Sequence, residues 1–521
     1  MYLQTLDIAV VAIYAVFLLV LAHWVSREKP GHEKNTQDYF LAGRSLPWWA
    51  IGASLIAANI SAEQIIGMSG SAYVMGIAIA SYEWMAAITL LIVGKYLLPV
   101  FLKHKIYTMP QFLEQRFDHR VRMVMASFWL GVYVLVNLTS ILWLGSLAIN
   151  SVTGMEQTYG LILLGSFAMA YSLYGGLKAV ALTDIIQVVL LVFGGLMIAW
   201  IAMNEISGGA GVLTGFGMVM EQLPEKFHMI FTKDSPHYDL LPGISVLIGG
   251  MWIMNLSYWG FNQYIIQRAL GAKSTREAQK GIVFAAFLKM LMPVIVVLPG
   301  IAAVMLVPDL PTPDRAYPAV MKLLPIGFKG LVFAALIAAI VSSLASMTNS
   351  ISTIFTMDMY AHFKPAETSQ KHLVRVGRTV SFSAMVIAMV VARPLLGNFD
   401  QAFQYIQEFT GFFTPGIVAI FLLAMFWKKT TANGALGAAI GSAVMSLGFK
   451  LLWPSLPFID RVGLVFLLCI GLGMVISIMQ DGKIQERAIE YGEVDTSTSS
   501  GFNLASFVIV LMLAGLYITW W

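Results

Sequence analysis

The sequence predicts an all-α polytopic membrane protein, and three observations support this fold class. Of its 521 residues, 58% are hydrophobic and 12% are charged, against about 25% charged residues in an average soluble protein. Apolar runs of about 20 residues, the length of helix that crosses a bilayer core of about 30 Å, recur along the whole chain. The Lys and Arg residues are distributed unevenly among the loops. A soluble enzyme and a nucleic-acid-binding protein are therefore poor alternatives.

Fourteen candidate membrane spans follow from the apolar runs and the charged residues between them. Their approximate limits are 6–25, 46–68, 76–102, 121–149, 158–174, 179–203, 242–266, 278–306, 328–360, 374–396, 400–427, 433–453, 460–480 and 502–521. An even number of spans places both termini on the same side of the membrane. The Gly-rich segment 204–241 is expected to be an external loop with a short surface helix near residues 212–222.

The basic residues indicate the orientation of the chain. Alternate loops hold 22 of the 32 Lys and Arg residues, the opposite loops hold 8, and Lys95 and Lys289 fall within spans. Because Lys and Arg accumulate in cytoplasmic loops, the richer side is predicted to be cytoplasmic and both termini to lie outside. The first apolar run is not typical of a cleaved signal peptide, because Asp7 precedes it and its flanking basic residues follow it.

Two spans look interrupted, and they occupy matching positions five spans apart. The second span opens with Pro47 and contains Asn59 in a polar stretch, and the seventh opens with Pro242 and contains Asn255. Paired broken helices in inverted repeats indicate a transporter's binding site, although polar residues also gather where membrane helices pack. The expected organisation is an N-terminal peripheral helix and loop (1–45), a first inverted repeat (46–203), the external loop (204–241), a second inverted repeat (242–427) and C-terminal peripheral helices (428–521).

The cysteine and histidine residues argue against a redox centre. Cys469 is the single cysteine, so the chain has no intrachain disulfide and no CxxC pair. All eight histidines fall in predicted loops or at span ends, where they are poorly placed to ligate a haem within the membrane.

Several segments resemble the sodium/solute symporter family. The segments are DYFLAGRSLPWWAIGASLIAANISAEQ, YGGLKAVALTDIIQV, FNQYIIQRALGAKSTREAQKG, AALIAAIVSSLASMTNS and QAFQYIQEFTG. Within that family the chain is most similar to the bacterial sodium/galactose and the animal sodium/glucose carriers. The resemblance implies a LeuT-type fold with ten core helices in residues 46–427, and sodium-driven uptake by alternating access.

The resemblance also implies a sodium site between the break of the first core helix and the eighth core helix. The matching positions are the carbonyl groups of Ala57, Ile60 and Ala339 and the hydroxyl groups of Ser342 and Ser343. The spacing agrees, because residues three and four apart share a helix face, so Ala339, Ser342 and Ser343 can offer three oxygen atoms together. The alternative is that these serines bond to their own helix or act as small packing residues.

Polar residues within the spans form the expected sugar site. Glu83 and Lys289 lie about 10 and 13 Å inside the ends of their spans, and ionisable residues at such depth face a cavity or a partner. A purely structural ion pair is the alternative for these two. The resemblance places the following residues at the sugar: Asn59, Gln64, Glu83, Asn255, Tyr258, Lys289 and Gln407.

Two further roles come from the resemblance. It implies an outer gate formed by Met68, Tyr82, Tyr258 and Phe403. It also implies that sodium leaves through Asp184, although an acid at the start of the span 179–203 could equally complement a helix dipole. Ala86 stands where the bacterial galactose carrier has a serine, so the choice between galactose and glucose stays open. Glu63 has no assigned role.

These observations predict sodium-coupled symport of a neutral monosaccharide in a bacterial inner membrane. One sodium per sugar is expected, because Ala345 removes a hydroxyl group from the S-S-x-[ST]-S pattern of family members that carry a second sodium. An inositol-like polyol, sialic acid and a passive channel are the alternatives, and the lack of a central Arg in the core spans disfavours an anionic solute. The expected partners are sodium, a sugar and the lipid bilayer, with no nucleic acid and an open oligomeric state.

Overall fold

The structure, a computed structural model, describes residues 3–25, 41–363, 369–397, 402–480 and 482–521, without the side chains of residues 22, 25 and 171–183. Throughout this part of the chain the backbone is helical or forms turns and short connections, and an isolated bridge pairs Leu46 with Ala272. The all-α prediction is confirmed for the described residues.

The first half of the chain runs from a peripheral helix through the first predicted repeat to the external segment. Labels with η mark 3-10 or π-helical turns, several of which continue an α-helix. The elements are α1 (Thr5–Val25), η1 (Ala42–Arg44), α3 (Trp48–Asn59), η2 (Glu63–Met68), α4 (Ser69–Met75), η3 (Gly76–Ala80), α5 (Ser81–Ile92), η4 (Val93–Leu97), α6 (Leu98–Lys103), α7 (Met109–Arg116), α8 (His119–Val132), η5 (Tyr133–Leu138), α9 (Thr139–Thr153), α10 (Gln157–Ile206), α11 (Val212–Gln222) and η6 (Pro224–Phe227). Helix α11 confirms the short helix predicted in segment 204–241.

The second half contains the second predicted repeat and three C-terminal helices. The elements are α12 (Ile244–Ile248), α13 (Gly250–Leu256), η7 (Ser257–Phe261), α14 (Gln263–Leu270), α15 (Thr275–Met292), η8 (Pro293–Val297), α16 (Leu298–Leu306), η9 (Pro313–Arg315), α17 (Ala316–Met321), α18 (Phe328–Thr353), η10 (Ile354–Tyr360), η11 (Ala361–Phe363), α19 (Gln370–Leu396), α20 (Ala402–Thr410), α21 (Thr414–Phe426), α22 (Ala432–Leu452), α23 (Phe458–Gln480), η12 (Tyr491–Glu493) and α24 (Ser500–Thr519).

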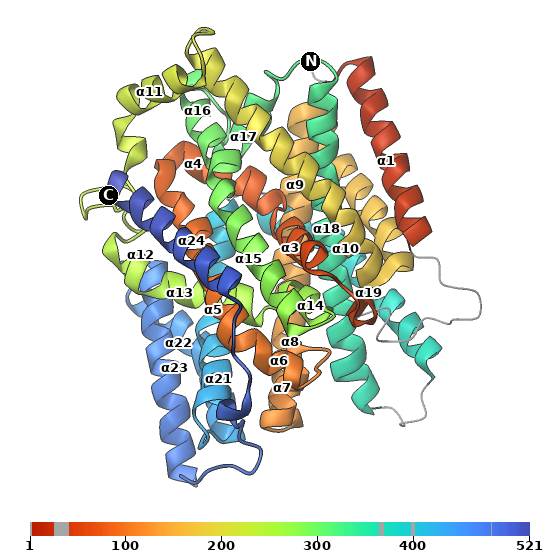
Figure 1. The fold of residues 1–521 in the computed structure, drawn as a ribbon, viewed down its shortest axis with the longest axis vertical. Coiled ribbons are helices and arrows are strands. Elements are labelled where there is room, and N and C mark those ends of the chain that lie inside the picture. The colour runs from red at the N-terminus through yellow and green to blue at the C-terminus, as the bar shows by residue number, and fades with distance from the viewer. Residues whose placement is uncertain (1–2, 26–40, 364–368, 398–401, 481) are drawn as a thin grey trace.

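Helix α3 is enclosed by its neighbours, whereas the terminal helices lie outside. Helices α10, α14, α15 and α18 pack against α3, whose residues from Ala50 to Asn59 are all buried. Helix α24 lies across α15 and α5, and α1 packs beside α18 and α10 at the opposite edge (Figure 1). Helices α22 and α23 pack against each other and against α21. The molecule therefore has an enclosed centre around α3 and an outer layer that includes α1, α22, α23 and α24.

Two glycines let α3 and α15 approach each other closely. A Cβ atom on Gly52 would lie 2.7 Å from the carbonyl oxygen of Gly281, and one on Gly281 would lie 2.8 Å from the Cβ of Ile51. Small residues at helix contacts are typical of membrane proteins, where close van der Waals packing drives association. This contact positions the site, because α15 carries Lys289 toward the end of α3.

The connection predicted between the spans 158–174 and 179–203 lies within residues 171–183, outside the part of the chain whose placement the structure describes in full. On either side of it the chain is helical, over Gln157–Ala170 and Asp184–Ile206. The division into two spans therefore stays a prediction.

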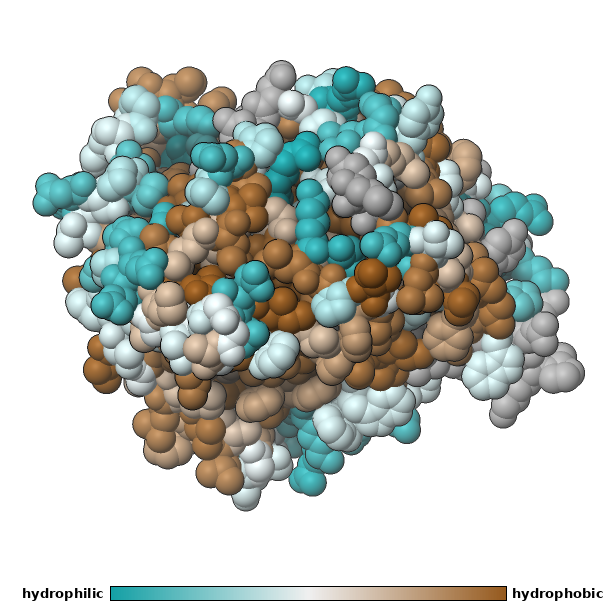
Figure 2. Space-filling model, turned by 90° about the horizontal axis from the view of Figure 1, so that it is seen from above, coloured by the Kyte–Doolittle hydropathy of each residue, from teal (hydrophilic) through white to brown (hydrophobic). Residues whose placement is uncertain are grey.

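The number of spans and the location of the termini stay predictions. In the described part of the chain, 9 helices are long and apolar enough to cross a membrane, or 10 if the bent pair α20–α21 is one span. The outer surface agrees with a membrane setting, since Leu504, Phe507 and Leu511 of α24 are 65%, 60% and 54% exposed. Figure 2 shows broad hydrophobic patches between hydrophilic clusters in the view from above. Exposed apolar surface of this kind marks contact with a membrane.

Candidate functional site

The first interrupted helix breaks within residues 59–64, between α3 and η2. Helix α3 ends at Asn59, Ile60 has a ψ of 74°, and helical structure resumes at Glu63. The Ser61 hydroxyl accepts a hydrogen bond from the backbone N–H of Glu63 at 3.1 Å and donates one to Gln64 Oε1 at 3.0 Å. Serine followed three residues later by glutamine is a helix-start signature, because the serine satisfies a free N–H group of the new helix. This spacing is visible in the sequence and explains why the helix restarts there.

The seventh predicted span is interrupted on both sides of Asn255. A first interruption lies at Gly249, between α12 and α13, with φ −119° and ψ −130°. Asn255 lies within α13, where its amide donates to the Met251 carbonyl at 3.1 Å. Beyond it, the backbone is non-helical at Asn262, with φ −78° and ψ 120°. The Asn262 side chain accepts hydrogen bonds from the N–H of Tyr264 at 3.3 Å and from the Tyr133 hydroxyl. Asn262 therefore caps α14 and ties the second break to η5.

A polar cavity lies beside the two broken helices. Residues of η2, α5, α8, α13, η7, α20 and α21 contribute to its wall. Every predicted sugar or gate residue except Lys289 lines this cavity, namely Asn59, Gln64, Met68, Tyr82, Glu83, Asn255, Tyr258, Phe403 and Gln407. The structure thus brings these side chains together, while their roles in binding stay predictions.

Lys289 is the buried centre of a polar cluster next to the cavity. Its side chain is 0% exposed, and its ammonium group donates to Glu83 Oε2 and Asn59 Oδ1. The same group lies 4.9 Å from the centroid of the Trp259 ring. The Asn59 amide in turn donates to the Tyr258 hydroxyl at 3.0 Å. Because an unpaired ammonium ion is costly inside a membrane protein, Glu83 neutralises Lys289, and the cluster fixes Asn59 and Tyr258.

The residues predicted to form the outer gate are in contact. The rings of Tyr82 and Phe403 meet edge to face with their centroids 5.3 Å apart. Met68, Tyr82 and Phe403 are 1%, 8% and 1% exposed. Gly67 permits this approach, since a Cβ atom there would lie 2.9 Å from the Cβ of Phe403. These side chains therefore cover the cavity on one side.

Sequence reasoning missed part of the cavity wall. Glu63, which had no assigned role, lines the cavity and accepts a hydrogen bond from the Ser140 hydroxyl at 2.5 Å. Further lining residues without a predicted role are Phe128, Trp129, Val132, Tyr133, Asn137, Met254, Ser257, Trp259, Asn262, Ile406, Thr410, Phe413, Thr414 and Ile417. Most lie in apolar stretches, so no local signal marks them. Ala86 is 1% exposed and is not among the described lining residues.

The predicted sodium ligands lie where the end of α3 meets α18. The Ser343 hydroxyl donates to the carbonyl oxygen of Ala58 at 3.1 Å and to that of Ala57 at 3.4 Å. All five predicted ligands are at most 1% exposed: Ala57, Ile60, Ala339, Ser342 and Ser343. The structure therefore joins the Ala57 carbonyl directly to Ser343. Carbonyl and hydroxyl oxygens suit a hard cation.

Asp184 belongs to the same buried region. It is 0% exposed and lies in α10 directly after residues 171–183, so its predicted role at the start of a helix stays a prediction. Its carboxylate accepts hydrogen bonds from the Ser342 hydroxyl and from the Ser54 hydroxyl, the latter at 2.6 Å. The Arg268 guanidinium lies 3.9 Å away. Asp184 thus bonds to a predicted sodium ligand, and its role in sodium release stays a prediction.

Two interrupted helices with a buried polar cavity beside them are typical of a secondary transporter. Comparison with known proteins agrees. The chain matches the Sodium:solute symporter family over residues 39–441. It is 50% identical to the Sodium/glucose cotransporter of Vibrio parahaemolyticus, with 100% of this chain and 99% of that protein covered. It is 31% identical to the Sodium/myo-inositol cotransporter 2 of Mus musculus, over 85% of this chain and 70% of that protein.

A solved structure shows the same fold. A Na+-coupled sialic acid symporter in a substrate-bound outward-open state superposes with a TM-score of 0.79 at 23% identity, covering 91% of this chain and 98% of that one. The chain belongs to the Sodium:solute symporter family. It is an integral membrane protein that transports a solute with sodium as its coupling ion, and its relatives are carriers and not enzymes.

Replacing Lys289 by methionine should destabilise the protein, because Glu83 would stay buried without its cation. Losing one member of a buried ion pair costs about 3–5 kcal/mol, whereas replacing both members by neutral groups costs far less. The unfolding temperature of Lys289→Met in detergent should fall, and adding Glu83→Gln should restore most of the loss. Lys95→Met is the control, since Lys95 is partly exposed beside the Tyr96 ring. An unchanged unfolding temperature in Lys289→Met would contradict a buried pair.

Proposed function

We propose that the protein carries a neutral monosaccharide, galactose or glucose, together with sodium across a bacterial inner membrane by alternating access. The name of the Vibrio relative, which this chain matches along its whole length, supports a hexose as the solute. The proposed sugar-binding residues are the predicted residues that line the cavity, together with Lys289, which lies beside it and bonds to Asn59.

The composition of the cavity wall is the observation that carries this proposal. Its polar residues are amides, hydroxyls and carboxyls, and among the described residues no Lys or Arg lines it. The neighbouring cation, Lys289, is already paired with Glu83. Amides and hydroxyls offer the donors and acceptors that the hydroxyl groups of an uncharged sugar need. An anionic solute such as sialic acid would require an unpaired cation, usually Arg.

Tyr258 supports a ring-shaped solute. Its hydroxyl group is held by the Asn59 amide and pairs with the Tyr264 hydroxyl, which restrains the ring at the cavity wall. An apolar aromatic face with a polar edge suits the C–H face of a pyranose. A cyclitol presents a similar ring of hydroxyl groups, so inositol is the second candidate, in line with the name of the mouse relative. Uptake of labelled hexoses, inositol and sialic acid into proteoliposomes separates these solutes, and uptake without accumulation would indicate a channel.

The proposed sodium ligands are the carbonyls of Ala57, Ile60 and Ala339 and the hydroxyls of Ser342 and Ser343. Ser343 already reaches two carbonyl oxygens at the end of α3. Ser342 is oriented by its bond to the Asp184 carboxylate, and an acceptor for the hydroxyl hydrogen leaves the oxygen lone pairs available for a cation. Sodium binding would therefore hold the end of α3 against α18 and couple the ion to the sugar-binding residue Asn59.

Ser343→Ala should abolish sodium-stimulated uptake, because it removes one of two hydroxyl ligands. Initial rates of hexose uptake into proteoliposomes with and without external sodium measure the effect. Ser352→Ala is the matched control, since Ser352 is a 0% exposed serine of the same helix whose hydroxyl has no hydrogen-bond partner among the described residues. Sodium stimulation that persists in Ser343→Ala would rule out this site.

Gln64→Ala should weaken apparent sugar affinity. An unpaired sugar hydroxyl in a desolvated cavity costs about 1–3 kcal/mol, or about a 5- to 150-fold rise in the half-saturation concentration. The control is Gln404→Ala, because Gln404 is a buried glutamine on α20 that does not line the described cavity. An unaltered half-saturation concentration in Gln64→Ala would place the sugar elsewhere.

The coupling ratio should be one sodium per sugar. Ala345 contributes no side-chain oxygen, and the Ser346 hydroxyl already accepts a hydrogen bond from Arg268. One charge moving through 100 mV contributes about 2.3 kcal/mol, and a tenfold sodium gradient adds about 1.4 kcal/mol, which together support about 500-fold accumulation. Reversal potentials in proteoliposomes with set sodium and sugar gradients measure the ratio. A value near two would show that Ala345 does not remove a second site.

A further inference from the structure

Helix α20 carries both a gate residue and a proposed sugar residue, and it joins α21 at a sharp bend. Phe403 closes against Tyr82, and Gln407 lines the cavity one turn further along the same helix. The axes of α20 and α21 differ by 44° across the short break between Thr410 and Thr414. A displacement of α20 about this bend would move Phe403 and Gln407 together.

The bend rests on the C-terminal helix pair α22–α23. The Phe412 carbonyl at the bend accepts hydrogen bonds from the Ser442 hydroxyl at 2.8 Å and from the Ser446 hydroxyl at 3.4 Å. The Ser442 hydroxyl also accepts a hydrogen bond from the backbone N–H of Gly416 at 3.0 Å. Helix α22 therefore holds the start of α21 and the bend through backbone groups, so this part of the chain forms a fixed support.

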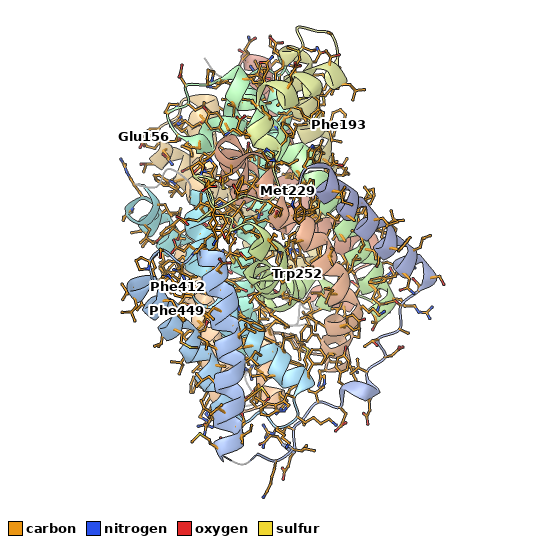
Figure 3. The ribbon with its side chains drawn as sticks, turned by 90° about the vertical axis from the view of Figure 1, so that its left-hand side faces the viewer. Glu156, Phe193, Met229, Trp252, Phe412 and Phe449 are labelled. Atoms are coloured by element: carbon orange, nitrogen blue, oxygen red, sulfur yellow. The ribbon has the colours of Figure 1, made fainter. Side chains whose placement is uncertain are left out.

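Glu408 connects α20 itself to the same support. Its Oε1 lies 2.9 Å from the Lys450 ammonium at the end of α22 and 2.9 Å from the Arg461 guanidinium at the start of α23. The Phe412 ring lies under both cations, 5.3 Å from the Arg461 guanidinium and 5.7 Å from the Lys450 ammonium. In the view of Figure 3, Phe412 is labelled directly above Phe449, the residue that precedes Lys450 in α22.

The three charged groups differ in exposure, which decides how strongly they interact. The Arg461 side chain is 6% exposed, against 32% for Glu408 and 47% for Lys450. A cation as buried as Arg461 gains more from a carboxylate than an exposed one does, because water screens the pair less. The contact between Glu408 and Arg461 is therefore the main tie, and Lys450 adds a weaker one.

We propose that Glu408 is a positioning residue that holds α20 in the closed-gate position against α22 and α23. Separation of Phe403 from Tyr82 requires α20 to pivot at the bend, and this movement pulls Glu408 away from Arg461. The peripheral helix pair thus sets the free energy of opening on the gate side. Glu408 follows Gln407 directly in the chain, so the same tie fixes the helix that presents Gln407 to the cavity.

The test measures how often the gate opens. Met254 lines the cavity and is 7% exposed, and the native Cys469 is 0% exposed, so a Met254→Cys protein has one reporter thiol. A membrane-impermeant methanethiosulfonate reagent is added to the gate side of proteoliposomes without sodium or sugar, and the labelling rate is recorded. Glu408→Gln should raise this rate about three- to tenfold, as expected when a partly buried ion pair no longer holds the closed state.

The matched control is Glu156→Gln. Glu156 pairs with Arg393 at 3.9 Å, both side chains are more than half exposed, and Figure 3 places Glu156 well apart from Phe412. Its labelling rate should equal that of the parent. If folded Glu408→Gln protein is also labelled at the same rate as the parent, the proposal is overturned.

A second measurement separates positioning from simple loss of stability. A gate that opens more often exposes the binding site, so in Glu408→Gln the half-saturation concentration for external sugar should fall while the maximal rate falls. A purely structural defect lowers the maximal rate alone, and that result also overturns the proposal. If Glu408→Gln does not fold, Lys450→Gln replaces it, and its labelling rate should rise by a smaller factor; no rise contradicts the proposal. The labelling experiment needs no substrate, so it stands apart from the sugar assignment.

Discussion

The central constraint on this structure is that an interrupted helix inside a membrane must have its backbone groups satisfied by the protein itself. At the break between α3 and η2, Ser61 satisfies an N–H group of η2, and Ser343 donates to carbonyl groups of α3. The same groups that stabilise the break gather the oxygen atoms that suit a cation. They also leave Asn59 at the end of α3, where its side chain reaches Lys289 and Tyr258. The proposed ion site and sugar site are thus two sides of one break.

Two buried cations near this break have acidic partners. Lys289 is matched by Glu83, and Asp184 lies near Arg268 and accepts two hydroxyl groups. Because Lys289 already has an acidic partner, an entering solute does not have to supply one. The cavity wall presents amides, hydroxyls and the carboxyl groups of Glu63 and Glu83, in agreement with the proposed neutral sugar.

The contacts between α3 and α15 differ in kind from those that hold α20. Gly52 and Gly281 bring α3 and α15 into close contact, and a tightly packed interface of this kind resists small displacements. Helix α20 is short, begins its connection to α21 with a bend, and is tied to α22 and α23 by polar and ionic contacts. Ionic contacts of this type can break and form again at moderate cost, unlike an interlocked apolar surface. In the proposed mechanism, α22 and α23 thus influence the gate without lining the described cavity.

Local features of the chain predict the fold class, and together with the family resemblance they predict most residues of the candidate site. Apolar runs, the spacing of Ala339, Ser342 and Ser343 on one helix face, and family motifs around Asn59 are short-range signals, because helix geometry converts spacing along the chain directly into position. The break at Asn262 and the bond between Glu63 and Ser140 carry no such signal. Neither does the tie between Glu408 and Arg461, whose partners belong to different helices. These features depend on how helices distant in sequence pack together, and a hydrogen bond or ion pair between them exists only once that packing sets the distance and removes the competing water.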